Sequence, residues 1–369
     1  MLSEIEAHQF VRMRTRIAVE IAGLATAVPE HVMGQDEAIA RANKVFPQFA
    51  RRLSLFTNTG VETRYTVEPC EWYLEPRSWE ERTESFQRNA LILLEDVATR
   101  AIADAGLEPR DIDAIVTNTI TGLAIPSLDA RLMNRMPFRS DVERLPIFGL
   151  GCGGGVAGLA RAARMSRACA GHTILFLTVD LCSLCMRTAD PSLAMFVSSA
   201  LFSDGAAAVV LRGGEEQDLS GNSCKKGGLG RIITSGEHFW GNTEHIMGWD
   251  VRNDGFGVVL SPDLPELMQN NFSEALHGFL DREGLTLEDF DGFLFHPGGA
   301  KVLETVQEQL SLDRAGLAHS WDVLRDYGNM SSATALFVLQ SAIKSGARGR
   351  HLLAAFGPGF SAYFVVLDL

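Results

Sequence analysis

Residues 145–160 read LPIFGLGCGGGVAGLA, an apolar run that meets a glycine-rich turn and then a helical pattern. Apolar residues recur at helical spacing after the turn, so a helix is expected to begin just after Cys152. Unpaired N–H groups and the positive end of the helix dipole then favour the thiolate of Cys152, the nucleophilic form. The glycines are expected to let a bulky substrate approach the backbone. A small buried cysteine that fills a tight turn explains the stretch equally well.

The bulk composition is that of a globular protein with a large core. The chain has 369 residues, 46% hydrophobic and 21% charged, which suits one large domain or two fused halves. A formal net charge of -13 argues against nucleic acid or an anionic membrane as the main partner, although a local basic patch is still compatible with an anionic cofactor.

Targeting and cysteine usage point to the cytoplasm. Residues 1–15 are expected to form a helical leader without the apolar core of a signal peptide, and no stretch suits stable membrane insertion. The six cysteines are irregularly spaced, which is typical of reduced thiols. We therefore expect a cytoplasmic protein.

An internal repeat relates the two halves of the chain. Residues 101–116 (AIADAGLEPRDIDAIV) match residues 279–294 (FLDREGLTLEDFDGFL) at an offset of 178. The same offset relates residues 171–176 to 349–354, and an offset of 177 places Asn329 opposite Cys152. Each half thus reads as helix, strand, glycine-marked turn, helix and strands. This pattern predicts two α/β halves, each with a sheet buried between helices.

The remaining elements follow from local patterns. Strands are expected at 16–23, 206–211, 292–295 and 362–367, and helices at 35–57 and about 85–105, with an irregular excursion over 61–82.

Three polar residues fall at the ends of apolar runs. Cys152 and Asn329 open equivalent helices, and His296 follows the strand at 292–295. If the halves pack about a pseudo-twofold axis, the three converge at strand ends, where ligands usually bind. Alone, His296 would cap a strand and Asn329 a helix. Together with a cysteine they can activate a thiol or donate hydrogen bonds to a thioester carbonyl or enolate.

Two other motifs allow different chemistry. Gly149-x-Gly151-x-x-Gly154 has the dinucleotide-binding spacing of an NAD-dependent oxidoreductase, but Asp180 follows too late to be the acidic ribose ligand. Cys182-x-x-Cys185 lacks a second pair or a suitably spaced histidine, so a pair of core or pocket-lining thiols is a better interpretation than zinc or redox chemistry. No metal site is expected.

Taken together, these residues resemble a family signature. The chain resembles the type III polyketide synthases, the chalcone-synthase-like branch of the thiolase superfamily. The matching segments are FGLGCGGGVAGLARAA around Cys152, ALFSDGAAAVV at 200–210, FHPGGAKVLETV at 295–306, DYGNMSSATALFVL at 326–339 and AFGPGFSAYFVVL at 355–367.

The resemblance implies an α/β fold of thiolase type, with five layers αβαβα built from two pseudo-duplicated halves, residues 16–228 and 229–369, working as a homodimer. A ketoacyl synthase III-like enzyme that performs a single condensation is the nearer alternative, because such enzymes share the Cys-His-Asn trio without the GPG loop. A non-catalytic thiolase-fold protein is the alternative from another class.

The resemblance also implies the chemistry. Cys152 would take the acyl starter from an acyl-CoA, and His296 and Asn329 would bind malonyl-CoA and stabilise the enolate formed as CO₂ leaves. The enolate would then attack the acyl group on Cys152. Neither a metal nor a nicotinamide is implied, since the CoA thioesters are the substrates and no cofactor is needed.

Pocket residues follow by position. Phe202 matches the family's aromatic gatekeeper, and Gly357, Pro358 and Gly359 match the loop that shapes the cyclisation pocket. The chain departs from plant-type members elsewhere, with Val258 in place of a second gatekeeper Phe and Cys185 in place of a common pocket Thr.

Two further positions concern the partner subunit and CoA. Ile125 stands where a neighbouring subunit donates a pocket residue, and among the basic CoA-binding positions only Arg51 has a clear match. The smaller, apolar lining, together with residues 247–250 (MGWD), implies a fatty acyl starter and alkylpyrone or alkylresorcinol products, as in bacterial members.

Overall fold

A nine-stranded mixed sheet is the frame of the protein. The computed structural model describes residues 18–169, 171–213 and 228–369, so the expected leader at 1–15 lies outside the described residues. The sheet contains β1 (Val19–Ala27), β4 (Ala114–Thr119), β5 (Glu143–Phe148), β6 (Thr173–Leu181), β7 (Asp204–Gly213), β8 (Gly230–Phe239), β11 (Gly292–Phe295), β12 (Arg350–Gly357) and β13 (Ser361–Asp368). Their order is β11-β12-β13-β8-β1-β7-β6-β4-β5.

Two short ribbons stand apart from this sheet. β2 (His31–Gly34) pairs with β3 (Thr63–Thr66), and β9 (Met247–Arg252) pairs with β10 (Gly255–Leu260), both antiparallel. The helices are α2 (Gln35–Val45), α3 (Ser54–Asn58), α4 (Trp79–Asp104), α5 (Leu128–Leu132), α6 (Gly154–Ala168), α7 (Leu193–Leu201), α8 (Leu264–Glu283), α9 (Ala300–Leu310), α10 (Ala318–Tyr327) and α11 (Thr334–Lys344).

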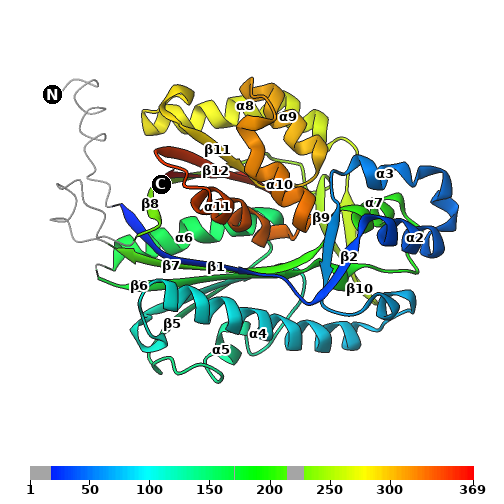
Figure 1. The fold of residues 1–369 in the computed structure, drawn as a ribbon, viewed down its shortest axis with the longest axis horizontal. Helices are drawn as coiled ribbons and strands as arrows, with labels where there is room; N and C mark the ends of the chain where they lie inside the picture. Colours follow the sequence, from blue (N-terminus) through cyan, green and yellow to red (C-terminus); the bar gives the residue numbers. More distant parts are fainter. Residues whose placement is uncertain (1–17, 170, 214–227) are drawn as a thin grey trace.

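The helices and strands form five layers (Figure 1). Helices α6 and α11 lie in the middle, and their buried side chains share one hydrophobic cluster with strands from both halves of the sheet. Helix α4 covers the outer face of the first half, and α8 and α9 cover that of the second, each with its own cluster. The predicted αβαβα arrangement is therefore confirmed, with the two halves of the sheet joined through the antiparallel pair β1 and β8.

The internal repeat is visible in backbone conformation. Gly106 and Gly284 follow α4 and α8 with φ of +67° and +68°, and Gly171 and Gly349 precede β6 and β12 with φ of +81° and +87°. Such values lie in the left-handed region, which glycine enters without a steric penalty. The matched glycines therefore mark the same turns in both halves. The expected boundary at 228/229 adjoins residues 214–227, which are not among those described.

The helix expected over 35–57 is divided. Pro47 opens a 3-10 helix, η1 (Pro47–Arg52), between α2 and α3. Proline has no N–H to donate, and its ring disfavours the helical conformation in the preceding residue, so α2 ends at Val45.

Helix α4 begins earlier than the expected position near 85. Ser78 and Glu81 form a capping box, in which the Glu81 N–H donates to Ser78 Oγ at 3.1 Å and the Ser78 N–H donates to Glu81 Oε2 at 2.8 Å. This pair starts the helix at Trp79, inside the stretch that was expected to be irregular.

Candidate active site

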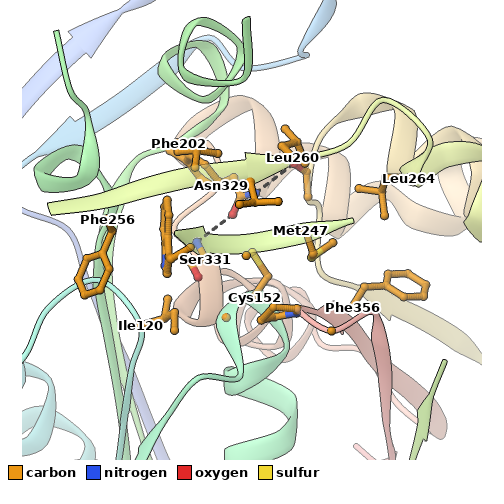
Figure 2. A pocket seen from close by; sticks show the side chains of 18 of the residues that line it. Ile120, Cys152, Phe202, Met247, Phe256, Leu260, Leu264, Asn329, Ser331 and Phe356 are labelled. Carbon is orange, nitrogen blue, oxygen red and sulfur yellow. Dashed lines mark hydrogen bonds between the residues drawn. The ribbon is translucent and has the colours of Figure 1, made fainter. Parts of the chain in front are cut away.

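The three residues singled out from the sequence line one cavity. Cys152 lies in the 3-10 helix η4 (Gly151–Gly153), directly before α6, as expected. His296 follows β11, and Asn329 lies between α10 and the 3-10 helix η9 (Ser331–Ala333), which leads into α11. All three border a main cavity of about 370 Å³ (Figure 2).

Two glycines near Cys152 allow the two halves of the protein to pack closely together. Gly151 has φ +49°, and a Cβ there would lie 2.5 Å from Pro358 Cδ. At Gly155 a Cβ would lie 2.0 Å from the backbone oxygen of Ser332. At both positions the absent side chain admits the other half of the protein, a role that the sequence did not reveal, while Gly151 also borders the main cavity.

Asn329 is held at both ends of its amide. Its Oδ1 accepts the Ser331 N–H at 2.8 Å, and its Nδ2 donates to the Gly298 carbonyl at 3.0 Å. The residue thus caps the turn before α11, as its sequence context suggested. Because an amide nitrogen carries two N–H groups, the second can donate to the Cys152 sulfur, with which the Asn329 side chain forms a hydrogen bond, or to a ligand that takes its place in the cavity.

His296 is buried without a partner. Its side chain is almost fully enclosed, and neither ring nitrogen has a hydrogen-bond partner among the described residues. Burial lowers the pKa of His296 to about 3. The imidazole is therefore neutral and offers one N–H donor and one acceptor. This state suits a hydrogen-bond donor to a substrate carbonyl, and it does not suit a permanent imidazolium ion.

The thiol of Cys152 is protonated in the free protein. Burial raises its pKa to about 11, and hydrogen bonds from Ser331 and Asn329 oppose that rise only in part. The prediction that the helix N-terminus favours the thiolate is wrong here, because desolvation of the charged sulfur outweighs the helix dipole.

Asp180 is a positioning residue that the sequence analysis missed. Ser332 donates both its N–H, at 3.0 Å, and its hydroxyl to the Asp180 carboxylate. The other carboxylate oxygen accepts the Ile120 N–H at 2.8 Å. Asp180 therefore ties the turn after Asn329 to the end of β6. The sequence offered a lone acidic residue at the end of the apolar run TILFLTVD, which we weighed only as a ribose ligand.

Phe202, the expected gatekeeper, is connected to Asn329 through the backbone. The Asn329 N–H donates to the Leu201 carbonyl, and the Ser203 N–H donates to the Asn329 carbonyl, both at 2.9 Å. The ring of Phe202 lies 6.3 Å from that of Trp249, measured between centroids. The positions of Phe202 and of the Asn329 amide are therefore linked by two backbone hydrogen bonds.

The remaining predicted residues fall in different places. Pro358, Gly359 and Val258 border the main cavity, whereas Gly357 precedes them at the end of β12. Cys185 borders a separate inner cavity, together with Cys182.

Arg51 and Ile125, like Gly357, border neither cavity. Arg51 is exposed on η1, and Ile125 is 94% exposed before Pro126. Among the described residues that border the main cavity, Glu244 is the only charged one. The structure thus supplies no cation there for the phosphates of CoA.

The glycine spacing weighed as a dinucleotide motif belongs to the cysteine turn. Gly149 and Gly151 border the main cavity beside Cys152. Within the described ranges, no helix has the length and apolar character needed to span a membrane.

Family models for chalcone and stilbene synthases match both halves, the N-terminal domain at residues 10–215 and the C-terminal domain at residues 231–368. The chain is 38% identical to 1,3,6,8-tetrahydroxynaphthalene synthase of Streptomyces peucetius subsp. caesius, over 94% of this chain and 92% of the relative. It is 33% identical to a putative chalcone synthase of Bacillus subtilis (strain 168), over 94% and 98%.

The same similarity extends to a solved structure. The 1,3,6,8-tetrahydroxynaphthalene synthase of Streptomyces coelicolor A3(2), described as a bacterial type III polyketide synthase, aligns with a TM-score of 0.87 and 32% identity, over 95% of this chain and 99% of that one.

Proposed function

The chain belongs to the chalcone and stilbene synthase family of type III polyketide synthases, and we propose that it extends an acyl group held on Cys152 by decarboxylative condensation with malonyl-CoA. Members are acyl-transferring condensing enzymes that need no cofactor beyond their CoA thioester substrates. Membership sets aside the dehydrogenase, the ketoacyl synthase III-like enzyme and the non-catalytic protein as alternatives. The convergence of Cys152, His296 and Asn329 on one cavity supports the proposed roles most strongly.

Acylation starts from two neutral groups. The Cys152 sulfur attacks the thioester carbonyl of the acyl-CoA and loses its proton as the new C–S bond forms. The neutral His296 ring can accept this proton and pass it to the sulfur of the departing CoA. The burial that keeps the thiol protonated in the free enzyme also excludes the water that would hydrolyse the acyl-enzyme.

Condensation depends on the hydrogen-bond donors His296 and Asn329. His296 and the second N–H of Asn329 donate hydrogen bonds to the carbonyl oxygen of the malonyl thioester. When CO₂ leaves, the electron pair of the broken C–C bond moves onto that oxygen, and fixed donors in a water-poor site stabilise the enolate. The enolate carbon then attacks the acyl carbonyl on Cys152, and the chain grows by two carbons.

The starter that fits this site best is a fatty acyl chain. The main cavity is bordered mostly by apolar side chains, among them Met247, Phe256, Leu260, Leu264 and Met268. Apolar walls favour an alkyl chain over a phenolic one, and repeated extension followed by cyclisation would give alkylpyrone or alkylresorcinol products. The similarity to tetrahydroxynaphthalene synthases makes a tetrahydroxynaphthalene the second candidate product.

A homodimer in the cytoplasm completes the proposal. Strand β5 is an edge strand that pairs only with β4 among the described strands, and its Leu145 and Phe148 are 40% and 50% exposed. Ile125 is also exposed. Exposed apolar residues beside an unpaired strand edge suit a self-complementary interface, and Ile125 would there reach the partner's site.

Product analysis tests the starter. The enzyme is incubated with malonyl-CoA and acyl-CoAs from acetyl to palmitoyl, and the products are identified by mass spectrometry. Long-chain pyrones or resorcinols are expected to dominate. A tetrahydroxynaphthalene formed from malonyl-CoA alone, with no use of the acyl-CoAs, would contradict the fatty acyl proposal and support the second candidate.

A further inference from the structure

A second, smaller cavity lies behind the gate. In this inner cavity the centre of a water-sized group has about 20 Å³ in which to move, and the cavity shares Phe202, Trp249 and Val258 with the main cavity. Unlike the main cavity, it is bordered by two arginines, Arg41 and Arg64. The two cavities therefore meet at the gate and differ in charge.

Arg64 is a buried cation without an acidic partner. It is 1% exposed and forms no salt bridge with any described carboxylate. Its Nε and Nη2 donate to the Ala200 carbonyl at 3.2 and 2.5 Å, and its Nη1 donates to Gln35 Oε1 at 2.8 Å. These bonds cap the end of α7, but they use only three of the five guanidinium N–H groups.

Arg41 adds a second positive charge. It is half-buried on α2, and its guanidinium lies 5.9 Å from the centre of the Tyr73 ring. The side chain of Arg41 forms a hydrogen bond with Cys70 and is attracted by the exposed Glu37, one turn earlier, but no described carboxylate forms a salt bridge with it. Burial and the charge of Arg41 together lower the pKa of Arg64 to about 9. Two cations that lack a carboxylate partner and lie close together in a poorly solvated place are costly unless an anion joins them.

A buried hydroxyl completes the site. Ser198 borders the inner cavity and is only 4% exposed, yet its Oγ has no hydrogen-bond partner among the described residues. The neighbouring hydroxyls are engaged: Ser199 donates to the Phe196 carbonyl at 2.7 Å and Ser183 to Asp204 at 2.5 Å. Buried polar atoms are rarely left unpaired, so Ser198 points to a missing acceptor.

We propose that the inner cavity binds a single carboxylate, held by Arg41, Arg64 and Ser198. A guanidinium binds a carboxylate through charge-assisted hydrogen bonds, and a serine hydroxyl can donate a further one. The carboxylate belongs either to a small free acid or to the far end of an acyl chain that passes the gate from the main cavity. In the second case the inference rests on the proposed function, because it extends the accepted starters to chains that end in a carboxylate.

The binding arm of the test uses ¹³C-formate and the full-length protein. The line width of formate is measured during titration with wild-type protein, Arg41→Gln and Ser198→Ala. We expect both variants to bind formate more weakly, Arg41→Gln by about tenfold or more, because a charged hydrogen-bond donor is lost. Arg110→Gln is the control, since Arg110 is an exposed arginine paired with Glu108 far from either cavity. If Arg41→Gln fails to fold, Ser198→Ala carries the test, because its hydroxyl has no protein partner to lose.

The starter arm identifies the source of the carboxylate. Hexanoyl-CoA and adipoyl-CoA, which differ in a terminal carboxylate, compete as starters with malonyl-CoA. A preference for adipoyl-CoA that Arg41→Gln removes would assign the site to the acyl chain, and formate binding without such a preference would assign it to a free acid. Equal formate line widths in wild type and variants, with no starter preference, would overturn the proposal. Formate binding requires no catalysis, so an inactive enzyme that still binds formate would contradict only the proposed function.

Discussion

The turns that carry Cys152 and Asn329 occupy equivalent places in the two halves, yet they are held by different forces. Around Cys152, glycines let Pro358 and the Ser332 backbone come so close that a Cβ would collide with them. Around Asn329, hydrogen bonds to Gly298, to Ser331 and to the backbone on either side of Phe202 set the position, and Asp180 anchors Ser332.

The difference explains how one duplicated turn performs two tasks. Close packing of the glycines fixes the turn that carries Cys152, whose sulfur also receives hydrogen bonds from Ser331 and Asn329. A hydrogen-bond network fixes the Asn329 amide and leaves its second N–H facing the cavity, where the Cys152 sulfur or a substrate can accept it. In the proposed mechanism the first half supplies the nucleophile and the second half supplies the donors, so the two roles should be separable by mutation.

Removing a donor should have the largest effect. His296→Ala is expected to slow the decarboxylation of malonyl-CoA by at least roughly 100-fold, because the enolate loses a fixed hydrogen bond. Alkylation of Cys152 by iodoacetamide should continue, since the thiol remains. Decarboxylation is followed by the release of ¹⁴CO₂ from carboxyl-labelled malonyl-CoA. An unchanged rate would remove His296 from the donor role and break the division between the halves.

Adding a methyl group where the two turns touch should have the second largest effect, on stability. Gly155→Ala places a Cβ 2.0 Å from the Ser332 oxygen, so the halves must separate locally. We expect a loss of about 3 kcal/mol in the free energy of unfolding, as for other overpacked sites. Gly34→Ala is the control, because a Cβ there meets nothing within 4 Å. Urea unfolding curves that coincide for the two variants would show that packing does not fix the Cys152 turn.

The pH dependence of stability should differ between His296 in the second half and Cys152 in the first. The folded pKa of His296 is about 3, below the unfolded value of about 6.5, so only the unfolded chain gains this proton as the pH falls below 6.5. Its neutral burial therefore costs about 2 kcal/mol of stability between pH 7 and pH 5. Cys152, whose pKa is raised to about 11, contributes nothing in that range.

Urea unfolding of His296→Gln at both pH values measures this contribution. The variant should lose about 2 kcal/mol less than the wild type on going from pH 7 to pH 5, whereas Cys152→Ala should follow the wild type. Parallel losses in wild type and His296→Gln would mean that His296 is not buried as a neutral ring.

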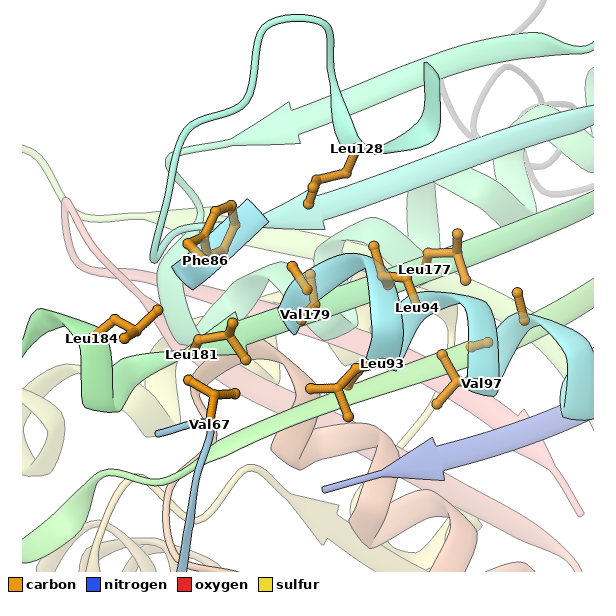
Figure 3. Packing of buried hydrophobic residues seen from close by; sticks show 14 of the residues in the cluster. Val67, Phe86, Leu93, Leu94, Val97, Leu128, Leu177, Val179, Leu181 and Leu184 are labelled. Carbon is orange, nitrogen blue, oxygen red and sulfur yellow. The ribbon is translucent and has the colours of Figure 1, made fainter. Parts of the chain in front are cut away.

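Much of the fold and the catalytic trio could be predicted from the sequence. The repeat placed Asn329 opposite Cys152, and the apolar periodicity of α4 predicted a helix whose Phe86, Leu93, Leu94 and Val97 pack in the first-half core (Figure 3). These features are local or recur at a fixed offset, so one sequence is enough to reveal them.

The charge state of the site and the inner cavity could not be predicted in this way. The thiol of Cys152 was expected to ionise, because the helix dipole is a local property whereas the burial that overrides it arises from tertiary packing. Arg41, Arg64 and Ser198 come from α2, β3 and α7, which are distant in the chain and share no motif. Their meeting depends on how those elements pack beneath the gate.

Formation of the acyl-enzyme tests whether Cys152 carries the acyl group. Wild type and Cys152→Ala are incubated with radiolabelled acyl-CoA, and protein-bound label is measured in parallel with decarboxylation of malonyl-CoA. We expect Cys152→Ala to carry no label but still to decarboxylate malonyl-CoA, since His296 and Asn329 are intact. Undiminished label on Cys152→Ala would contradict the assignment of Cys152 as the residue that carries the growing chain.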